Sequence, residues 1–298
     1  MLRILHFSDP HVEAPGAWVP PGEWLGKRAL AYVAHRLVRR RRFRYVDDRL
    51  RALSRFAQDE GIDLALCTGD LTALGTEPEL VRARRALAPF ERLPRGLVTF
   101  PGNHDIYLPR AVRDGRFERH FGDLLRSDRP DLATDGVYPL VRLPADGVAV
   151  VALCSARPNP APWRSSGRIP PAQLEGLRRI LQDPDIRDRW VAVATHHAPR
   201  LASGRPDRPW HGLVNAAALG RALRGLRRGM LVHGHVHERF HLSADPFGVP
   251  VFGAGSATDA GREGCWLYEV SGGGLEAWPC GFTGDRFARV GPAVRLSW

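Results

Sequence analysis

Residues 96–105 read GLVTFPGNHD, and this stretch joins an apolar run to a cluster of polar side chains. The run Gly96–Phe100 has the length and composition of a buried β-strand. It leads directly into Pro101-Gly102-Asn103-His104-Asp105, where an amide, an imidazole and a carboxylate follow one another. In open α/β sheets, ligands bind beyond the carboxyl ends of the strands. The stretch therefore predicts a strand with a functional site at its end.

The same arrangement recurs elsewhere in the chain. Apolar runs of strand length at Leu2–Phe7, Leu64–Thr68, Trp190–Thr195 and Met230–Val232 also end in polar motifs. In chain order these motifs are Ser8-Asp9-Pro10-His11, Gly69-Asp70, His196-His197-Ala198-Pro199 and His233-Gly234-His235-Val236-His237. Each motif alone is compatible with an ordinary turn. Solvated loops, however, do not need Asp, Asn and His at the ends of so many strands, so together the motifs predict one site built from distant segments.

Helical patterns lie between most of the apolar runs, to which Val148–Leu153 also belongs. Helices are predicted from about Val46, over Glu77–Leu93 with Thr76 as N-cap, and over Pro171–Leu181 and Asn215–Leu226. This alternation predicts an α/β fold. The later runs Val249–Phe252, Cys265–Val270 and Leu275–Trp278 predict a second, more antiparallel sheet packed on the first. With no internal repeat or linker, we expect a single domain over residues 1–298.

The chemistry of the motifs indicates metal binding. Carboxylates and imidazoles gathered in one place are unfavourable unless a cation compensates. Mixed nitrogen and oxygen ligands suit Zn, Mn or Fe better than Mg or Ca. The motifs offer more ligands than one ion takes, whereas two ions about 3.5–4 Å apart and bridged by a carboxylate would use them all. Such a pair polarises a phosphoryl oxygen and generates hydroxide near neutral pH for in-line attack.

The order of the motifs, D-x-H, G-D, G-N-H-D, H-H and G-H-x-H, resembles the calcineurin-like metallophosphoesterase family. The motifs run from Asp9 to His237, about three-quarters of the chain. The resemblance implies an α/β fold that is a four-layer α/β/β/α sandwich of two mixed sheets flanked by helices. It also implies hydrolysis of phosphodiester or pyrophosphate bonds.

The resemblance also implies roles for individual residues. The first metal would be bound by Asp9, His11, Asp70 and His237, and the second by Asp70, Asn103, His196 and His235. Asp70 would bridge two divalent ions (Mn, Fe or Zn, with Mn expected first). His104 would be the catalytic residue that protonates the leaving oxygen, and Asp105 would orient it. The family often has His-His-Pro-Pro where this chain has His196-His197-Ala198-Pro199, so His197 remains an alternative to His196. His233 is predicted to be a buried structural histidine.

The net charge of +11 is concentrated in one insertion at about residues 12–45. Between Lys27 and Arg44 lie eight basic residues and no acid, so this segment carries +8 of the +11. Trp18 and Trp24 precede an apolar stripe at helical spacing, formed by Leu30, Val33, Ala34, Leu37 and Val38. Three interpretations stay open: a helix packed on the domain with a solvated basic end, an amphipathic element on anionic membrane, and nucleic-acid binding.

Several substrates fit these patterns. The insertion directly follows Asp9 and His11, and some family members cleave a lipid-linked pyrophosphate, so a substrate resembling UDP-2,3-diacylglucosamine is one hypothesis. Ser165-Ser166-Gly167-Arg168-Ile169 with Gln173 resembles the cyclic-nucleotide phosphodiesterase-like branch. A nuclease and a non-catalytic scaffold of the same fold are further alternatives. The patterns do not predict an oligomeric state.

The predicted compartment is the cytoplasm. The cysteines at positions 67, 154, 265 and 280 form no CxxC pair, which is typical of free thiols in a reducing compartment. Neither a signal peptide nor an apolar stretch of membrane-spanning length is recognisable. Under the membrane interpretation, the protein would be peripheral on the inner membrane face.

Overall fold

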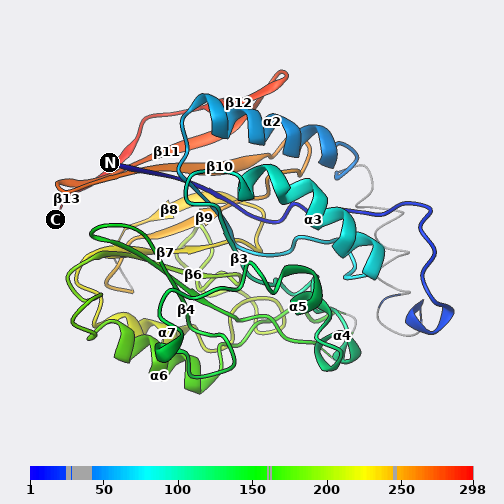
Figure 1. Cartoon of the computed structure of the whole chain (residues 1–298), viewed down its shortest axis with the longest axis horizontal. Helices are drawn as coiled ribbons and strands as arrows, with labels where there is room; N and C mark the ends of the chain where they lie inside the picture. Colours follow the sequence, from blue (N-terminus) through cyan, green and yellow to red (C-terminus); the bar gives the residue numbers. More distant parts are fainter. Residues whose placement is uncertain (25–27, 29–41, 160, 162, 244–246, 298) are drawn as a thin grey trace.

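The computed structural model describes residues 1–24, 28, 42–159, 161, 163–243 and 247–297. Two β-sheets lie face to face, with helices on both outer faces (Figure 1). Helices α2 (Val46–Asp59) and α3 (Glu77–Glu91) cover one face, and α6 (Pro171–Ile180) and α7 (Ala216–Leu223) cover the other. The predicted four-layer α/β/β/α sandwich is therefore confirmed.

The first sheet has the strand order β12-β11-β10-β1-β2-β3, and β13 pairs with β11. Strands β1, β2 and β3 run parallel, whereas β10 pairs antiparallel with β1, so that Leu2 lies opposite Val270. The strand bounds are β1 Leu2–Phe7, β2 Leu64–Cys67, β3 Leu97–Thr99, β10 Gly264–Ser271, β11 Gly274–Thr283, β12 Arg286–Arg289 and β13 Val294–Ser297.

The second sheet has the strand order β4-β5-β6-β7-β9-β8. Its four central strands run parallel, and the two edge strands pair antiparallel with their neighbours. The strand bounds are β4 Leu140–Ala145, β5 Val148–Leu153, β6 Trp190–Thr195, β7 Gly229–His233, β8 Arg239–Leu242 and β9 Val251–Ala254.

The late strands do not form a sheet of their own, which corrects one prediction. Strand β9 extends the second sheet beside β7, while β10 and β11 extend the first sheet beside β1. The C-terminal part of the chain therefore completes both sheets. Apolar alternation marks a strand, but it does not identify the partner of that strand.

Alternate residues of the central strands pack on opposite sides of the sheet. In β5, Val148, Val150 and Ala152 lie in the core between the sheets. Ala149, Val151 and Leu153 lie in the second core, which contains apolar side chains of α6 and α7. Burial on both faces explains why this strand reads as a continuous apolar run.

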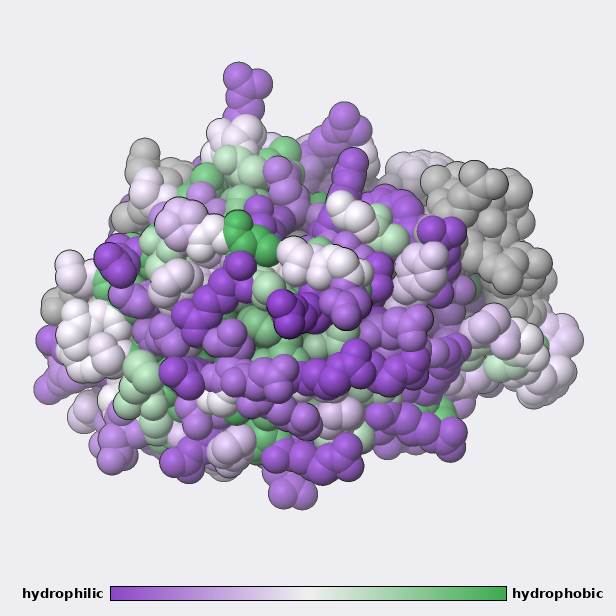
Figure 2. Space-filling view, turned by 90° about the horizontal axis from the view of Figure 1, so that it is seen from above, coloured by the Kyte–Doolittle hydropathy of each residue, from purple (hydrophilic) through white to green (hydrophobic). Residues whose placement is uncertain are grey.

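The remaining elements are short and lie outside the sandwich layers. They are helices α4 (Pro109–Arg113) and α5 (Arg116–Phe121) and the 3₁₀ turns η1 (Pro21–Trp24) and η3 (Pro130–Leu132). Hydrophilic residues cover most of the face that α2 and the outer strands of the first sheet form (Figure 2). The four cysteines are free, as predicted, and none of the described helices is long and apolar enough to cross a bilayer.

The insertion at about 12–45 is described only in part. The predicted apolar stripe from Leu30 to Val38 lies outside the described residues. Within the insertion, the structure describes residues 12–24, Arg28 and residues 42–45. Both of its described ends lie close to the site that follows.

Candidate metal centre

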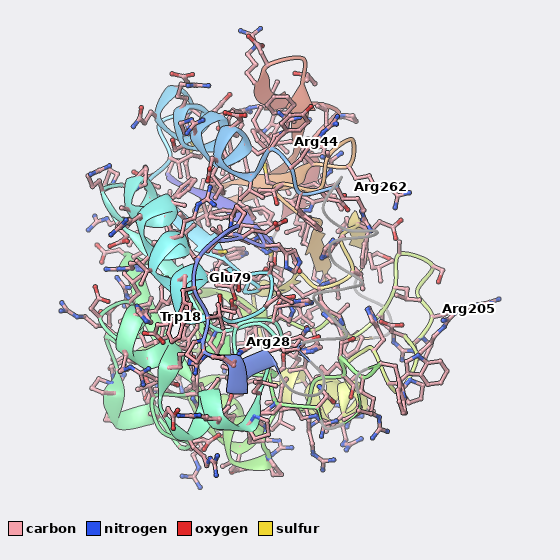
Figure 3. All side chains as sticks on the ribbon, turned by 90° about the vertical axis from the view of Figure 1, so that its right-hand side faces the viewer. Trp18, Arg28, Arg44, Glu79, Arg205 and Arg262 are labelled. Atoms are coloured by element: carbon pink, nitrogen blue, oxygen red, sulfur yellow. The ribbon has the colours of Figure 1, made fainter. Side chains whose placement is uncertain are left out.

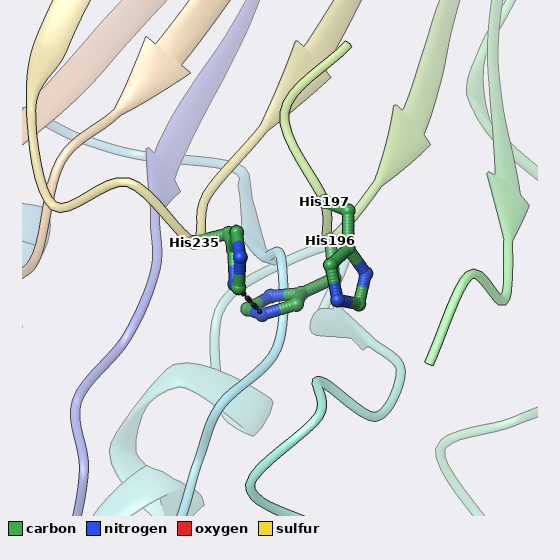
Figure 4. Close-up of side chains that lie close together, drawn as sticks. All are labelled: His196, His197 and His235. Atoms are coloured by element: carbon green, nitrogen blue, oxygen red, sulfur yellow. Dashed lines mark hydrogen bonds between the residues drawn. The ribbon is translucent and has the colours of Figure 1, made fainter. Parts of the chain in front are cut away.

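The predicted site residues come together at the strand ends. Their potential ligand atoms form four overlapping groups within 4.8 Å: Asp9–His11–His237, His11–Asp70–His104, Asp9–Asp70–His196 and His196–His197–His235. Figure 4 shows the last group, at the ends of β6 and β7. The sequence prediction that distant segments converge is thus met by the geometry.

The backbone is unusual at these positions. In the part of the chain that the structure describes, the residues other than glycine with positive φ are Asp9 (53°), His11 (45°), Asp70 (53°), His235 (72°) and His237 (53°). All five are candidate ligands. A left-handed backbone outside glycine costs about 1–3 kcal/mol and persists where the surroundings enforce it, often at functional sites.

His196 and His235 each direct one ring nitrogen at the other. His196 Nδ1 lies 2.8 Å from the Thr68 carbonyl, and His235 Nε2 lies 2.9 Å from the His211 carbonyl. A carbonyl only accepts, so each of these nitrogens donates, and in the neutral rings the other nitrogen carries a lone pair. Those nitrogens, His196 Nε2 and His235 Nδ1, are 3.3 Å apart. In the neutral rings these are facing lone pairs, which a metal ion or a proton between them makes favourable.

His11 and His237 repeat this arrangement on the other side of the site. His11 Nδ1 lies 3.3 Å from the Thr72 carbonyl, and His237 Nδ1 lies 3.6 Å from Asp259 Oδ2. Their Nε2 atoms are 3.0 Å apart. Metal-binding histidines commonly direct the second ring nitrogen to a carbonyl or carboxylate in this way.

The two carboxylates lie between and beside these histidine pairs. Asp70 Oδ2 lies 3.4 Å from His196 Nε2 and 3.9 Å from His11 Nε2, so it reaches both pairs. Asp9 Oδ1 is buried without a hydrogen bond among the described residues, although His237 Nε2 lies 3.2 Å away. Asn103 Oδ1 lies 3.1 Å from His196 Nε2. This donor set fits two adjacent divalent ions.

The pKa values of these groups also indicate a site that attracts cations. Burial opposes charge on Asp9 and Asp70, but the surrounding histidines hold both pKa values below the usual range. Burial opposes charge on His196, yet Asp70 raises its pKa to about 9. Burial lowers the pKa of His11 and of His235, which favours the neutral, metal-binding form of each.

Two glycines let the motifs approach each other. A Cβ on Gly102 would lie 2.1 Å from Asp70 Oδ1, and one on Gly234 would lie 1.9 Å from Ser8 Oγ and 2.5 Å from Asp9 Oδ2. No side chain fits at these distances. Both carboxylates therefore depend on a glycine from another motif.

His197 and His233 differ from the paired histidines. His197 Nε2 lies 2.9 Å from the Ser165 carbonyl and its Nδ1 lies 2.8 Å from Ser155 Oγ, and neither partner is a candidate ligand. His196 Nε2 instead faces Asp70 and Asn103. Although His197 lies within 4.8 Å of His196 and His235, this geometry favours His196 as the ligand. His233 is fully buried and its ring packs against Phe240, as expected of a structural histidine.

A backbone carbonyl contacts the His104 ring. Its Nδ1 lies 2.5 Å from the Ala73 carbonyl. The Asp105 oxygens instead accept hydrogen bonds from the backbone N–H groups of Leu71, Thr72 and Gly102. Asp105 thus fixes the loop after β2, which carries the Ala73 carbonyl that His104 contacts.

Sequence reasoning missed a set of contacts around His237. Asp259, in the loop after β9, accepts a 2.8 Å hydrogen bond from Arg42 Nε while facing His237. The Phe43 ring lies 4.9 Å from the His11 ring and 5.8 Å from the His237 ring. The sequence pattern that could have indicated Asp259 is the polar stretch after the run Val249–Phe252, because it is one more polar motif after a strand.

Comparison with known proteins agrees with this geometry. The family model of calcineurin-like phosphoesterases matches residues 2–239. A curated relative, a cAMP/cGMP dual specificity phosphodiesterase of Mycobacterium tuberculosis, is 32% identical over 210 residues. That match covers 69% of this chain and 58% of the relative, so the chain aligns with little more than half of the relative's length.

Two solved structures share the fold. A dimetal phosphatase from Danio rerio superposes with a TM-score of 0.65 at 15% identity, covering 99% of this chain and 98% of that one. A purple acid phosphatase from yellow lupin (Lupinus luteus) seeds superposes with a TM-score of 0.63 at 12% identity, covering 99% and 53%. The motifs, their convergence and the family match lead to one conclusion: the chain belongs to the calcineurin-like phosphoesterase family.

Proposed function

We propose that this protein is a phosphodiesterase that uses two divalent metal ions. The observation that carries the proposal is the presence of two histidine pairs, His11–His237 and His196–His235. Asp70 Oδ2 lies within 3.9 Å of one nitrogen in each pair. Asp9, His11, Asp70 and His237 would bind the first ion, and Asp70, Asn103, His196 and His235 the second. When bound, such a pair polarises a phosphoryl group and lowers the pKa of water.

His104 supplies the proton that the leaving oxygen needs. Nδ1 donates to the Ala73 carbonyl, and we assign the proton transfer to Nε2. In the reaction a water molecule releases one proton to solvent, its oxygen bonds to phosphorus and the ester P–O bond breaks. The protonated His104 then transfers its Nε2 proton to the departing oxygen. The His104 ring lies 4.8 Å from the His11 ring, at the edge of the metal site.

A nucleotide is the substrate that we propose first. The curated relative is a cAMP/cGMP phosphodiesterase, and two exposed tryptophans lie in the loops beside the site. Trp210 (47% exposed) precedes His211, whose carbonyl contacts His235. The Trp210 carbonyl accepts from Ser165 N at 2.9 Å, which joins its loop to that of Trp163 (75% exposed). Exposed aromatic rings are stacking surfaces for bases.

Basic side chains accompany these tryptophans. The Arg208 guanidinium lies 5.8 Å from the Trp210 ring. Arg157 binds the Ser166 carbonyl, and burial together with the nearby Arg168 and Arg164 lowers its pKa. A positive loop beside an aromatic surface suits an anionic nucleotide.

A lipid-linked phosphoester at an anionic membrane surface is the second candidate. A pocket of about 680 Å³ lies between the segment around Trp18, α3 and the helices α4 and α5. Apolar side chains such as Val19 and Val81 line it, and Arg110 and Arg119 are among its charged residues. The volume of the pocket lies within the range of small-molecule binding sites. Its apolar and basic side chains suit an acyl chain with a negative head group.

The remaining assignments are proposals of the same kind. We expect manganese as the metal that supports activity best and the cytoplasm as the compartment. Residues 1–298 would act as one domain, because C-terminal strands β10 and β11 complete the sheet that N-terminal β1 begins. Nucleic-acid binding would follow from the positive charge alone, so it ranks below the two substrates above.

An activity screen with manganese tests the proposal. Bis-p-nitrophenyl phosphate, cyclic AMP, cyclic GMP, UDP-2,3-diacylglucosamine and single-stranded DNA are the substrates, and His104→Ala is the inactive control. We expect turnover of cyclic nucleotides. If none of them turns over while UDP-2,3-diacylglucosamine does, the nucleotide proposal is wrong. Two bound metals without any turnover would favour the non-catalytic scaffold.

A pair of tryptophan variants separates the two candidates. A base that stacks on Trp210 contributes about 1–3 kcal/mol, so Trp210→Ala should raise the KM for cyclic AMP about 5- to 150-fold. Trp18→Ala is the matched control, because its ring is also exposed (76%) but lies in the apolar pocket. It should leave cyclic nucleotide turnover unchanged and weaken binding to anionic vesicles. The reverse pattern would reverse the ranking of the substrates.

A further inference from the structure

The loop that holds His104 runs from Leu71 to Thr76, between β2 and α3. Its Ala73 carbonyl accepts the hydrogen bond from His104 Nδ1. The loop also passes close to His104 at Gly75, where a Cβ would lie 2.6 Å from the His104 carbonyl. The position of this loop therefore sets the orientation of the His104 ring.

Buried charged side chains hold the loop around Gly75, and one of them, Arg116, donates from Nη1 to the Gly75 carbonyl at 3.3 Å. Glu79 Oε2 accepts hydrogen bonds from Leu74 N at 2.9 Å and from Thr76 N at 3.1 Å. Arg28 donates from Nε to the Leu74 carbonyl at 3.1 Å and from Nη2 to the Gly75 carbonyl at 3.0 Å. The exposed fraction is 0% for Arg28 and 4% for Glu79, and Figure 3 shows both side chains on the face where the insertion begins.

Helix capping explains only part of this arrangement. Glu79 and Thr76 form a capping box at the start of α3, in which each side chain bonds the backbone of the other. A capping box requires neither the bond from Leu74 N to Glu79 nor a buried arginine. Burying a guanidinium is costly unless its donors are satisfied, and here they reach the carbonyls of Leu74 and Gly75. The network thus holds the two residues that directly follow Ala73, which contacts His104.

We propose that Arg28 and Glu79 are positioning residues for His104. They fix the Ala73 carbonyl so that Nδ1 of His104 keeps its proton and Nε2 faces the substrate. The basic insertion then supplies part of the catalytic apparatus through Arg28. This inference rests on the proposed role of His104 in protonating the leaving oxygen.

Leaving-group dependence tests the proposal. We compare the p-nitrophenyl and phenyl esters of thymidine 5′-monophosphate, because p-nitrophenolate departs without a proton more readily than phenolate does. Arg28→Met should lower kcat for the phenyl ester about 10- to 100-fold, lower it less for the p-nitrophenyl ester, and leave both KM values unchanged. Arg28→Lys should recover part of the loss, because an ammonium still donates. Arg92→Met, an exposed arginine at the end of α3, is the matched control.

A second measurement does not depend on activity. Nitrogen-15 NMR of histidine in the zinc-loaded protein, recorded at a pH at which the His104 ring is neutral, reports the tautomer of His104. We expect the Nδ1–H form in the wild type and in Arg92→Met, and a mixture of tautomers in Arg28→Met and Glu79→Gln. An unchanged tautomer in both variants overturns the inference, as does an equal loss of kcat for both esters at full metal content. If instead His104→Ala hydrolyses the phenyl ester as the wild type does, the proposed role of His104 fails.

Discussion

Replacing Asp70 by asparagine removes the charge at the centre of the site but keeps its shape. Asp70 Oδ1 accepts a 2.7 Å hydrogen bond from His104 N, and an amide oxygen can do the same. Oδ2, within 3.9 Å of a nitrogen from each histidine pair, is the atom proposed to bind both ions. Asp70→Asn should therefore weaken both metal sites together while the surrounding backbone stays in place.

The expected effect follows from binding linkage. An ion at a free concentration 100-fold above its Kd stabilises the folded state by about 2.7 kcal/mol, so two ions contribute about 5 kcal/mol. Loss of an outer partner of a ligand already weakens metal affinity about 10- to 100-fold, and loss of a direct ligand should cost at least as much. The contribution of each ion then falls to about 0.4–1.4 kcal/mol at the same metal concentration. The increase in Tm that the two ions produce together should drop from about 10 °C to about 5 °C or less.

The assay is thermal unfolding with manganese and with EDTA, beside metal analysis and turnover of bis-p-nitrophenyl phosphate. Asp146→Asn is the matched control, because Asp146 is exposed in the turn between β4 and β5. It should keep the wild-type response to metal. An Asp70→Asn protein that retains two metals per chain, full turnover and the wild-type increase in Tm would refute the bridging role.

Three further predictions concern residues around the centre. Burial raises the pKa of Glu79 to about 7, so the stability that this group contributes is present below about pH 4.5 and is lost as the pH rises through 7. Burial raises the pKa of Asp105 to about 7 as well, so both groups contribute to the pH slope of the metal-free wild type, and Glu79→Gln should lose up to about 3 kcal/mol less over that range in urea unfolding; equal pH slopes would contradict this. Gly234→Ala must displace Ser8 and Asp9 and should lose bound metal, whereas Gly272→Ala, with no atom within 4 Å of its Cβ, should keep it. Asp259→Asn should weaken metal binding about 10- to 100-fold in a metal titration, with kcat restored at saturating metal, because Asp259 faces His237 Nδ1; an unchanged titration would exclude that role.

Local patterns predicted the strands well, but they did not predict the neighbours of each strand. Runs such as Leu2–Phe7 and Trp190–Thr195 coincide with β1 and β6 because both strands are buried on both faces. The pairing of β10 with β1 joins residues more than 250 positions apart, and no local pattern encodes it. Edge strands such as β8, whose residues are only half buried, give too weak an apolar signal to be recognised.

For the site too, local patterns predicted some features and not others. Its side-chain groups were predictable because each motif follows a strand. The contact between His104 and Ala73 was not, because every residue has a carbonyl and the identity of Ala73 gives no signal. Arg28 could be recognised as part of a basic segment, but its burial against two carbonyls distinguishes it from the other arginines only in three dimensions.

The backbone acceptors have a chemical role beyond holding the rings in place. A neutral imidazole has one proton, and the nitrogen that carries it cannot bind a metal. The carbonyls of Thr68, Thr72 and His211 each lie within 3.3 Å of one ring nitrogen and assign the proton to it. The opposite nitrogens then point into the centre as lone pairs. At His104 the Ala73 carbonyl holds Nδ1 in the same way, and Nε2 is the nitrogen proposed to transfer a proton, so backbone acceptors orient the proposed ligands and the proposed acid alike.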